Sequence, residues 1–222
     1  MSIKGAIFDM DGTLVDSLGV WEEIWSGLGA RYKDDPAFHP DESIDKACRT
    51  MTLSEDMHLI HKEFGFGESA DELFDFVMEL CVDYYKEKVE LKAGVEEFLE
   101  YLKVLGVKMC LATASPIVFV DIALDKLDIR KYFDSILSCE EVGKNKAFPD
   151  VFLEGMRRIG CELSNTWVFE DSLTSIETAT AAGFKTVGIY DRNNFGAERV
   201  AKIATEYVGA DGSFRELIGK IK

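Results

Sequence analysis

The spacing of apolar residues divides the chain into two parts. Residues 3–8 form a short apolar run and predict a buried strand. From about residue 18 to residue 89, apolar side chains recur at helical spacing, and turn residues interrupt them at 36–40 and 65–67. The clearest stripes are Trp21, Ile24, Trp25, Leu28; Leu53, Met57, Ile60, Phe64; and Leu73, Phe76, Val77, Leu80, Tyr84. This region is therefore predicted to be all-helical.

From residue 93 onward the pattern alternates between helix and strand. Amphipathic helical stretches repeatedly precede short apolar runs, which is typical of a parallel sheet with helices on both faces. The predicted helices lie at about 95–105, 117–127, 149–159 and 173–182, and the predicted strands at about 107–112, 135–138, 166–169 and 185–190. The sequence thus predicts a doubly wound α/β fold, with residues 1–17 and 90–222 as its core and residues 18–89 as an inserted all-helical domain.

Composition narrows the choice of partners. The chain has 222 residues, 47% of them hydrophobic, which supports a sizeable core. A net charge of −16 argues against nucleic acid or an anionic membrane surface as a partner. No apolar run approaches the ~20 residues of a membrane span, and no signal-peptide pattern precedes the first strand. The five cysteines are scattered, without metal-like spacing. We therefore expect a reduced, cytoplasmic protein, a monomer or weak homodimer, that acts on a small molecule.

The candidate chemistry begins where the first predicted strand ends. The segment from Phe8 to Ser17 reads Phe-Asp-Met-Asp-Gly-Thr-Leu-Val-Asp-Ser. Asp9 and Asp11 are two positions apart, so both carboxylates can face one side of the strand. Two such charges are unfavourable together unless a cation lies between them or one carboxyl is protonated. The pattern indicates a reaction site, although an Asp-Gly turn leaving a strand would use the same residues.

This segment resembles the opening motif of the haloacid dehalogenase superfamily, Asp-x-Asp-Gly-Thr-(Leu/Val). The resemblance implies a Rossmann-like core, a helical cap inserted just after the motif, and a reaction through a phosphoaspartate or a related ester. It also implies that Asp9 is the nucleophile and Asp11 the general acid/base. An aspartate in the second position is similar to the phosphatase and phosphomutase branches.

Two later segments fit the same resemblance. Thr113 follows the second predicted core strand, in the place of the family's phosphate-binding Ser or Thr, and Ala114 would offer its backbone N–H. An ordinary Ser/Thr helix cap is the alternative. Lys146 aligns without a gap with the lysine of Lys-Pro-x-Pro-Asp, although Ala147 replaces the first proline. Its ammonium would lie near the nucleophile and the phosphoryl group. Lys144 is the rival, and a solvated lysine pair is the alternative.

Glu170 and Asp171 end another predicted buried strand. Adjacent buried acids are costly unless they bind a cation or cap a helix. Oxygen ligands suit Mg²⁺, which would offset the charge of an anionic substrate. The resemblance implies that the Asp9 carboxylate, the Asp11 backbone carbonyl and Asp171 bind Mg²⁺, with Glu170 in the coordination shell or next to it.

The predicted helical domain offers fewer signals. Members of the sugar-phosphate branches carry an arginine in a comparable cap loop, so the resemblance implies that Arg49 contacts the substrate; a surface arginine is the alternative. His58 and His61 have a spacing that could chelate a metal, but no further ligand is evident, and we interpret them as helix-surface residues. Trp21 is interpreted as a core residue close to the cleft between cap and core.

These observations favour a Mg²⁺-dependent phosphatase that hydrolyses a small phosphorylated metabolite, in the first place a sugar phosphate, through an aspartyl phosphate. A β-phosphoglucomutase-like phosphomutase would use the same two aspartates and transfer the phosphoryl group to a second sugar hydroxyl. The third hypothesis is a non-catalytic regulatory or binding module on the same fold. The presence of Asp9, Asp11, Thr113, Lys146 and Asp171 together speaks against that module.

Overall fold

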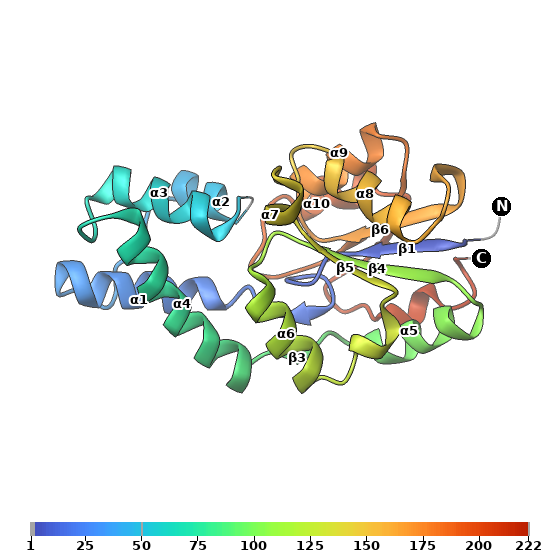
Figure 1. The fold of residues 1–222 in the computed structure, drawn as a ribbon, viewed down its shortest axis with the longest axis horizontal. Coiled ribbons are helices and arrows are strands. Elements are labelled where there is room, and N and C mark those ends of the chain that lie inside the picture. The colour runs from blue at the N-terminus through green and yellow to red at the C-terminus, as the bar shows by residue number, and fades with distance from the viewer. Residues whose placement is uncertain (1–2, 50, 222) are drawn as a thin grey trace.

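A six-stranded parallel sheet forms the centre of the protein (Figure 1). A computed structural model describes residues 3–49 and 51–221. The strand order is β5-β4-β1-β6-β7-β8, and each neighbouring pair is parallel. The strands are β1 Gly5–Phe8, β4 Lys108–Thr113, β5 Ser135–Ser138, β6 Thr166–Glu170, β7 Lys185–Ile189 and β8 Glu206–Val208. This topology confirms the predicted doubly wound α/β fold.

Helices cover both faces of the sheet, with α8 and α9 above it and α5 and α6 below it in Figure 1. The helices of this part are α5 Val95–Val104, α6 Ile117–Lys126, α7 Cys139–Val142, α8 Asp150–Arg158, α9 Leu173–Ala181 and α10 Ala197–Ile203. Short 3₁₀ turns lie at Arg130–Tyr132, Leu163–Asn165 and Phe214–Leu217. The helices α7 and α10 and the strand β8 are additions that the apolar pattern did not predict.

The central strand is buried on both faces because successive side chains point to opposite sides of the sheet. On β1, Ala6 and Phe8 join the larger apolar cluster, whereas Ile7 joins a second cluster on the other face. The next strand, β4, divides in the same way, with Leu111 in the first cluster and Cys110 in the second. Two apolar layers therefore hold the strands rigidly, and the residues that follow each strand are placed by that packing.

Four helices form a separate layer at one end of the molecule (Figure 1). They are α1 Val20–Lys33, α2 Glu42–Cys48, α3 Leu53–Phe64 and α4 Ala70–Glu87. Side-chain caps fix three of their starts: Asp41 caps α2, Thr52 forms a capping box with Glu55 on α3, and Ser69 caps α4. The α2 helix was not among the three predicted stripes.

The chain passes between this layer and the sheet through a two-stranded antiparallel pair. The strand β2, Val15–Asp16, pairs with β3, Glu90–Leu91. Both connecting segments therefore run side by side. The division of the chain into an independent cap and core stays a prediction.

The buried face of α4 differs from the predicted stripe. The fully buried positions are Leu73, Val77, Cys81 and Tyr85, whereas Tyr84 is only partly buried. The reason is that α4 packs against α1 and α3 on one side and against α6 on the other, so its apolar surface is wider than one stripe.

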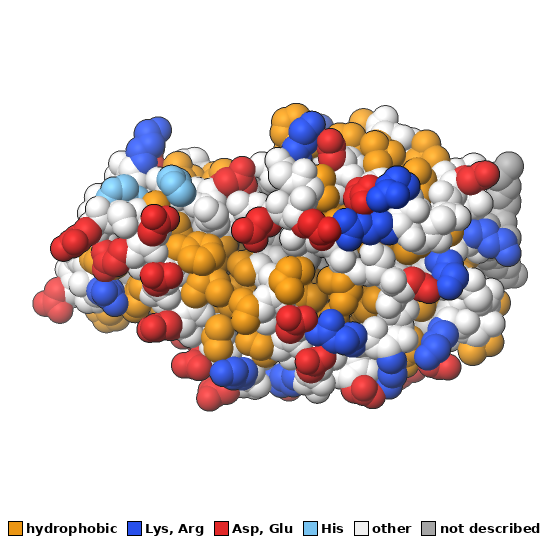
Figure 2. Space-filling view, viewed as in Figure 1, with side chains coloured by type: hydrophobic (Ala, Val, Ile, Leu, Met, Phe, Trp, Pro, Cys, Tyr) orange, Lys and Arg blue, Asp and Glu red, His pale blue; other side chains and the backbone are white. Residues whose placement is uncertain are grey.

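Apolar side chains gather on the surface where the helical layer meets the rest of the molecule, and acidic side chains surround the outer end of that layer (Figure 2). No helix among the described residues combines the length and apolar character that crossing a membrane requires.

Candidate active site

The predicted site residues meet at the carboxyl ends of three neighbouring strands. Asp9 directly follows β1, Thr113 ends β4 and Glu170 ends β6. These strands are the adjacent β4-β1-β6 in the middle of the sheet. After β5 the chain returns to the other side of β1 to form β6, so the site lies at the point where the strand order reverses.

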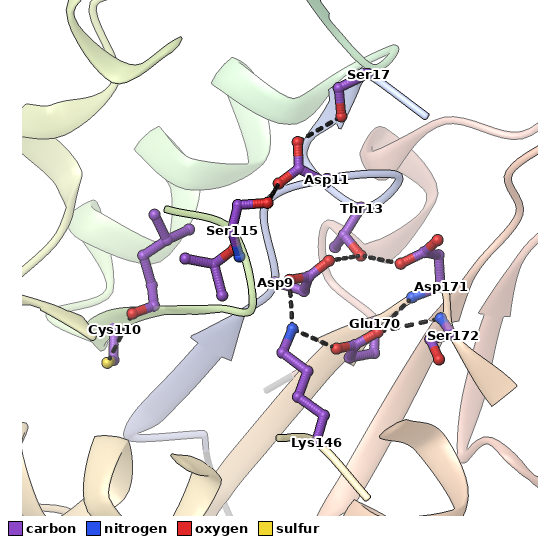
Figure 3. A network of polar contacts seen from close by, with 12 residues as sticks. Asp9, Asp11, Thr13, Ser17, Cys110, Ser115, Lys146, Glu170, Asp171 and Ser172 are labelled. Carbon is purple, nitrogen blue, oxygen red and sulfur yellow. Dashed lines mark hydrogen bonds and ion pairs between the residues drawn. The ribbon is translucent and has the colours of Figure 1, made fainter. Parts of the chain in front are cut away.

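Three buried carboxylates form the centre of this site (Figure 3). Asp9, Glu170 and Asp171 each place one carboxylate oxygen within 4.8 Å of the oxygens of the other two. All three side chains are almost fully excluded from solvent. Like charges this close in a dry environment are strongly unfavourable without a counter-charge.

One lysine supplies part of that counter-charge. The Lys146 ammonium donates to Asp9 Oδ1 and, at 2.6 Å, to Glu170 Oε1. Lys144, its rival in sequence, instead pairs with Asp150 and is half exposed. The loop between α7 and α8 therefore delivers the lysine that the family register indicated, even though Ala147 stands where the proline was expected.

The formal charge of the cluster indicates that it can bind a further cation. Three carboxylates against one ammonium leave a formal charge of −2 when all are ionised. Burial raises the pKa of Asp9 well above its ordinary value, although the Lys146 ammonium opposes this. Burial, followed by the neighbouring Glu170 carboxylate, raises the pKa of Asp171 to about 7. Burial lowers the pKa of Lys146, but Asp9 and Glu170 outweigh it and raise the pKa overall.

The donor set fits magnesium. All the candidate ligand atoms are carboxylate oxygens, with no thiol or imidazole among them, and hard oxygen ligands are those that Mg²⁺ prefers. A divalent cation would cancel the residual formal charge of −2. The Asp11 side chain is not part of this cluster. Its backbone carbonyl stays a predicted ligand.

Hydroxyl and amide groups position the carboxylates. The Thr13 hydroxyl lies 3.0 Å from Asp171 Oδ1 and 3.3 Å from Asp9 Oδ2, between the two acids. The Asn194 amide donates to Asp171 Oδ2 at 2.6 Å. Thr13 lies within the opening motif, so the motif could have identified it as a site residue. Asn194 comes from the loop after β7, and nothing in the sequence near it marked a site.

The Asp9–Asp11 turn depends on one glycine. Gly12 has φ of +75°, a backbone conformation that favours glycine. A Cβ at this position would also collide with the Asp171 carboxylate. The turn therefore lets β1 and the end of β6 approach closely enough to build the carboxylate cluster.

Asp11 belongs to a different network from Asp9. Figure 3 shows that its Oδ1 accepts from the Ser17 hydroxyl, at 2.6 Å, and its Oδ2 from the Ser115 hydroxyl, at 2.7 Å. Oδ1 also accepts from the Tyr85 hydroxyl. Tyr85 is almost fully buried on α4, so this contact joins the helical layer to the sheet. Sequence reasoning missed Ser17 and Tyr85 as partners of Asp11, and treated Ser115 as a possible helix cap.

The turn after β4 places Thr113 beside the same cavity. The Thr113 hydroxyl accepts the backbone N–H of Ser115 at 3.0 Å. The following helix α6 has Pro116 at its cap and no side-chain cap bond. Thr113 thus makes a local turn contact and does not cap the helix. Ala114 lines the cavity together with Thr113, so both stay candidates for binding phosphate.

A cavity of about 110 Å³ lies between the carboxylate cluster and the helical layer. Arg49 and Trp21 line it on the helical side. Arg49 is buried, not a surface side chain, and its guanidinium is already engaged: it donates to Asp45 at 3.0 and 3.1 Å and to the Asn193 carbonyl at 2.7 Å. Trp21 is buried and packs against Trp25.

The histidine pair does not form a metal group among the described residues. His58 contacts the carbonyl of Ser54, and His61 contacts the carbonyl of Phe66. Figure 2 shows histidine side chains on the outer surface of the helical layer. Their rings satisfy nearby backbone groups.

The fold and the site together define an α/β protein with a buried acidic centre that suits a divalent cation and a phosphate ester. The sequence matches the family model described as haloacid dehalogenase-like hydrolase over residues 6–189. The chain belongs to the haloacid dehalogenase-like hydrolases, as the opening motif had indicated.

Named relatives cover most of the chain. It is 26% identical over 185 residues to the phosphorylated carbohydrates phosphatase of Thermotoga maritima, covering 83% of this chain and 84% of the relative. It is also 26% identical over 189 residues to hexitol phosphatase B of Escherichia coli, covering 83% and 82%. The crystal structure of CbbY from Rhodobacter sphaeroides in complex with phosphate superimposes with a TM-score of 0.82 at 20% identity, covering 97% and 96%. That likeness shows a shared fold.

Proposed function

We propose that the protein is a Mg²⁺-dependent phosphatase that hydrolyses a small phosphorylated carbohydrate through an aspartyl phosphate on Asp9. The observation that carries this proposal is the buried cluster of Asp9, Glu170 and Asp171 with Lys146, at the carboxyl edge of the sheet. The names of the two relatives, both phosphatases of phosphorylated carbohydrates or hexitols, support the substrate class.

In the first step an Asp9 carboxylate oxygen forms a bond to phosphorus as the ester P–O bond breaks. The Asp11 carboxyl gives its proton to the leaving oxygen. The Ser17, Tyr85 and Ser115 hydroxyls orient Asp11, and each can rotate to accept or donate as Asp11 changes protonation state. In the second step water attacks phosphorus, Asp11 takes the proton from that water, and the Asp9 carboxylate is released.

Lys146 holds Asp9 in place and offers positive charge where phosphoryl oxygens would lie. Thr113 and the backbone N–H of Ala114 are the groups on the β4 side that would receive the remaining phosphoryl oxygens. Glu170 orients Lys146 and also accepts the backbone N–H groups of Asp171 and Ser172, both at 3.1 Å. Mg²⁺ bound by Asp9, Asp171 and the Asp11 carbonyl, with Glu170 at or next to it, would supply charge neutralisation of the phosphoryl group.

The test is a panel of phosphate esters assayed for phosphate release with Mg²⁺ and with EDTA. We expect metal-dependent release from sugar or sugar-alcohol phosphates, and none from Asp9→Asn. Hexose-phosphate isomerisation is measured in parallel. Isomerisation that outruns phosphate release would replace the phosphatase with a phosphomutase, and no turnover of any ester would favour a binding module.

A further inference from the structure

The helical side of the cavity carries a buried acid that the proposed mechanism does not use. Asp56, on α3, is 1% exposed and lines the same cavity as Asp9. Among the described residues, its Oδ1 has no hydrogen-bond partner. A buried polar atom without a partner is costly, and such atoms are rare in folded proteins. A ligand group that formed a hydrogen bond with Oδ1 would therefore remove this cost.

A second buried acid of the helical layer is fully hydrogen-bonded, so a buried carboxylate oxygen without a partner is not a general feature of this layer. Asp45 is equally buried, but it accepts two bonds from Arg49 and one from the Trp25 indole at 2.8 Å. Arg49 also donates to the Asn193 carbonyl, so its guanidinium is occupied and does not neutralise Asp56. Among the described residues, the layer thus satisfies Asp45 fully and leaves Oδ1 of Asp56 without a partner.

The surroundings of Asp56 select the ligand chemistry. From the helical layer, Trp21, Ile24, Met51 and Leu53 give the cavity an apolar wall, and Asp56 is the one carboxyl among the described lining residues of that layer. A hydroxyl matches Oδ1 whether Asp56 is ionised or protonated, because a hydroxyl both donates and accepts. A second phosphate or a carboxylate would meet the negative charge of an ionised Asp56, and Arg49, the cation on this side of the cavity, is already paired with Asp45.

Two ionisable groups, Glu55 and Cys48, lie near Asp56. Burial, followed by the neighbouring Glu55 carboxylate, raises the pKa of Asp56 well above its ordinary value. The Cys48 thiol faces Asp56 from α2, and burial followed by the charge of Asp56 raises the pKa of that thiol in turn. Neither group supplies a positive charge, so an anion gains nothing at this end of the cavity.

We propose that Asp56 is a specificity residue that hydrogen-bonds a hydroxyl on the part of the substrate remote from the transferred phosphate. The enzyme then prefers monophosphates of uncharged sugars or sugar alcohols to esters that carry a second anionic group. This inference rests on the proposed phosphatase function and adds the substrate class.

The first test compares substrates across two variants. Asp56→Leu removes both the charge and the acceptor, whereas Asp56→Asn keeps an acceptor and removes the charge. We expect Asp56→Leu to lower kcat/KM for sorbitol 6-phosphate roughly 10- to 150-fold, the range for a hydrogen bond to a charged group. For p-nitrophenyl phosphate, which has no hydroxyl to offer, the expected change is less than about twofold.

Asp56→Asn is expected to improve turnover of fructose 1,6-bisphosphate and phosphoglycolate relative to sorbitol 6-phosphate. An equal loss on all substrates, or no change on any, overturns the proposal.

The second test is independent of turnover. Sorbitol 6-phosphate and inorganic phosphate are titrated calorimetrically, with Mg²⁺, into Asp9→Asn and into the double variant Asp9→Asn/Asp56→Leu. We expect the second change to weaken sorbitol 6-phosphate binding and to leave phosphate binding unaltered. If the wild type hydrolyses no ester but this difference appears, the phosphatase proposal fails and the Asp56 proposal stands. Equal binding of sorbitol 6-phosphate by both variants overturns it.

Asp45→Asn is the matched control for folding. It breaks a fully paired buried acid and is expected to lower Tm, whereas Asp56→Asn removes a buried carboxyl whose Oδ1 has no described partner and is expected to leave Tm unchanged or raise it. A loss of Tm in Asp56→Asn as large as that in Asp45→Asn would assign Asp56 a structural role instead.

Discussion

Asp9 and Asp11 lie two positions apart, yet they belong to different environments. Asp9 faces the ammonium of Lys146 and two other carboxylates, whereas Asp11 accepts bonds from hydroxyls alone. This separation fits the roles proposed above, in which Asp9 is the nucleophile and Asp11 the proton carrier. Tyr85 is the one member of the Asp11 network that comes from the helical layer, so it offers a direct way to test the orienting role.

Tyr85→Phe is expected to slow turnover roughly 10-fold, because Asp11 loses the hydroxyl that fixes its orientation. The unfolding free energy should fall by about 0.5–1.5 kcal/mol, the usual net value of one hydrogen bond. The measurements are steady-state kinetics and urea denaturation. Tyr84→Phe on the same helix is the control, because Tyr84 is only partly buried and is not among the described hydroxyl donors to Asp11, which are Ser17, Tyr85 and Ser115. Identical effects of the two changes would show that the hydroxyl of Tyr85 has no particular role.

The raised pKa of Asp56 predicts how the unfolding free energy depends on pH. Its pKa in the folded protein is raised by burial and then by Glu55, whereas in the unfolded chain it is about 3.9. Between these two values the folded state binds more protons than the unfolded state, so the stability contributed by this group falls as pH rises. The unfolding free energy of the wild type minus that of Asp56→Asn, measured in urea denaturation, should therefore decrease as pH rises above about 4. An increase over the same interval would contradict the assignment.

The turn after β1 is the element that brings the carboxylates together. Its Gly12 is needed for two separable reasons, a positive φ and the closeness of Asp171. Gly106 has φ of +70° as well, but a Cβ there would meet nothing within 4 Å. Comparing alanine substitutions at Gly12 and Gly106 therefore separates the effect of backbone strain from the effect of a Cβ that collides with Asp171.

Both Gly12→Ala and Gly106→Ala are expected to lose about 1–2 kcal/mol of stability from left-handed backbone strain. Only Gly12→Ala should also lose metal-dependent phosphate release, because its Cβ displaces the Asp171 carboxylate. Denaturation and activity at saturating Mg²⁺ measure the two effects. Retained activity in Gly12→Ala would mean that the position of Asp171 is not critical.

Arg49 links the helical layer to the sheet. It pairs with Asp45 inside the layer and donates to the Asn193 carbonyl in the loop after β7, whose next residue, Asn194, holds Asp171. The molecule thus has a continuous polar connection from the helical layer to the acidic centre. The predicted contact of Arg49 with substrate stays a prediction, and it would require one of these bonds to be exchanged.

Arg49→Ala is expected to cost about 3–5 kcal/mol, because it leaves Asp45 buried and unpaired. Adding Asp45→Asn should restore part of that loss, and a double-mutant cycle in urea measures the coupling. If Arg49 also binds substrate, the charge-neutral double variant should bind a sugar phosphate less tightly than Asp45→Asn alone, with p-nitrophenyl phosphate unaffected. Strictly additive stability effects would show that the Arg49–Asp45 pair is not coupled.

The sequence predicted the fold more completely than the surroundings of the site. Short, nearly continuous apolar runs on β1, β4 and β6 mark buried parallel strands locally, so the sheet could be predicted. The roles of Tyr85 and Asn194 depend on how α4 and the loop after β7 pack against the motif, which no local pattern encodes. The same limit explains Asp56, which no local pattern in the sequence marked as a site residue.

The covalent step on Asp9 is the central claim, and mapping the phosphoryl acceptor tests it most directly. The enzyme is mixed with a sugar-alcohol phosphate and Mg²⁺, quenched in acid, reduced with borohydride and digested for mass spectrometry. An aspartyl phosphate is reduced to homoserine, so we predict homoserine at position 9 in the wild type, absent when EDTA replaces Mg²⁺. Phosphate release at full rate with the modification at another residue, or with substantial activity left in Asp9→Asn, would contradict the proposed mechanism.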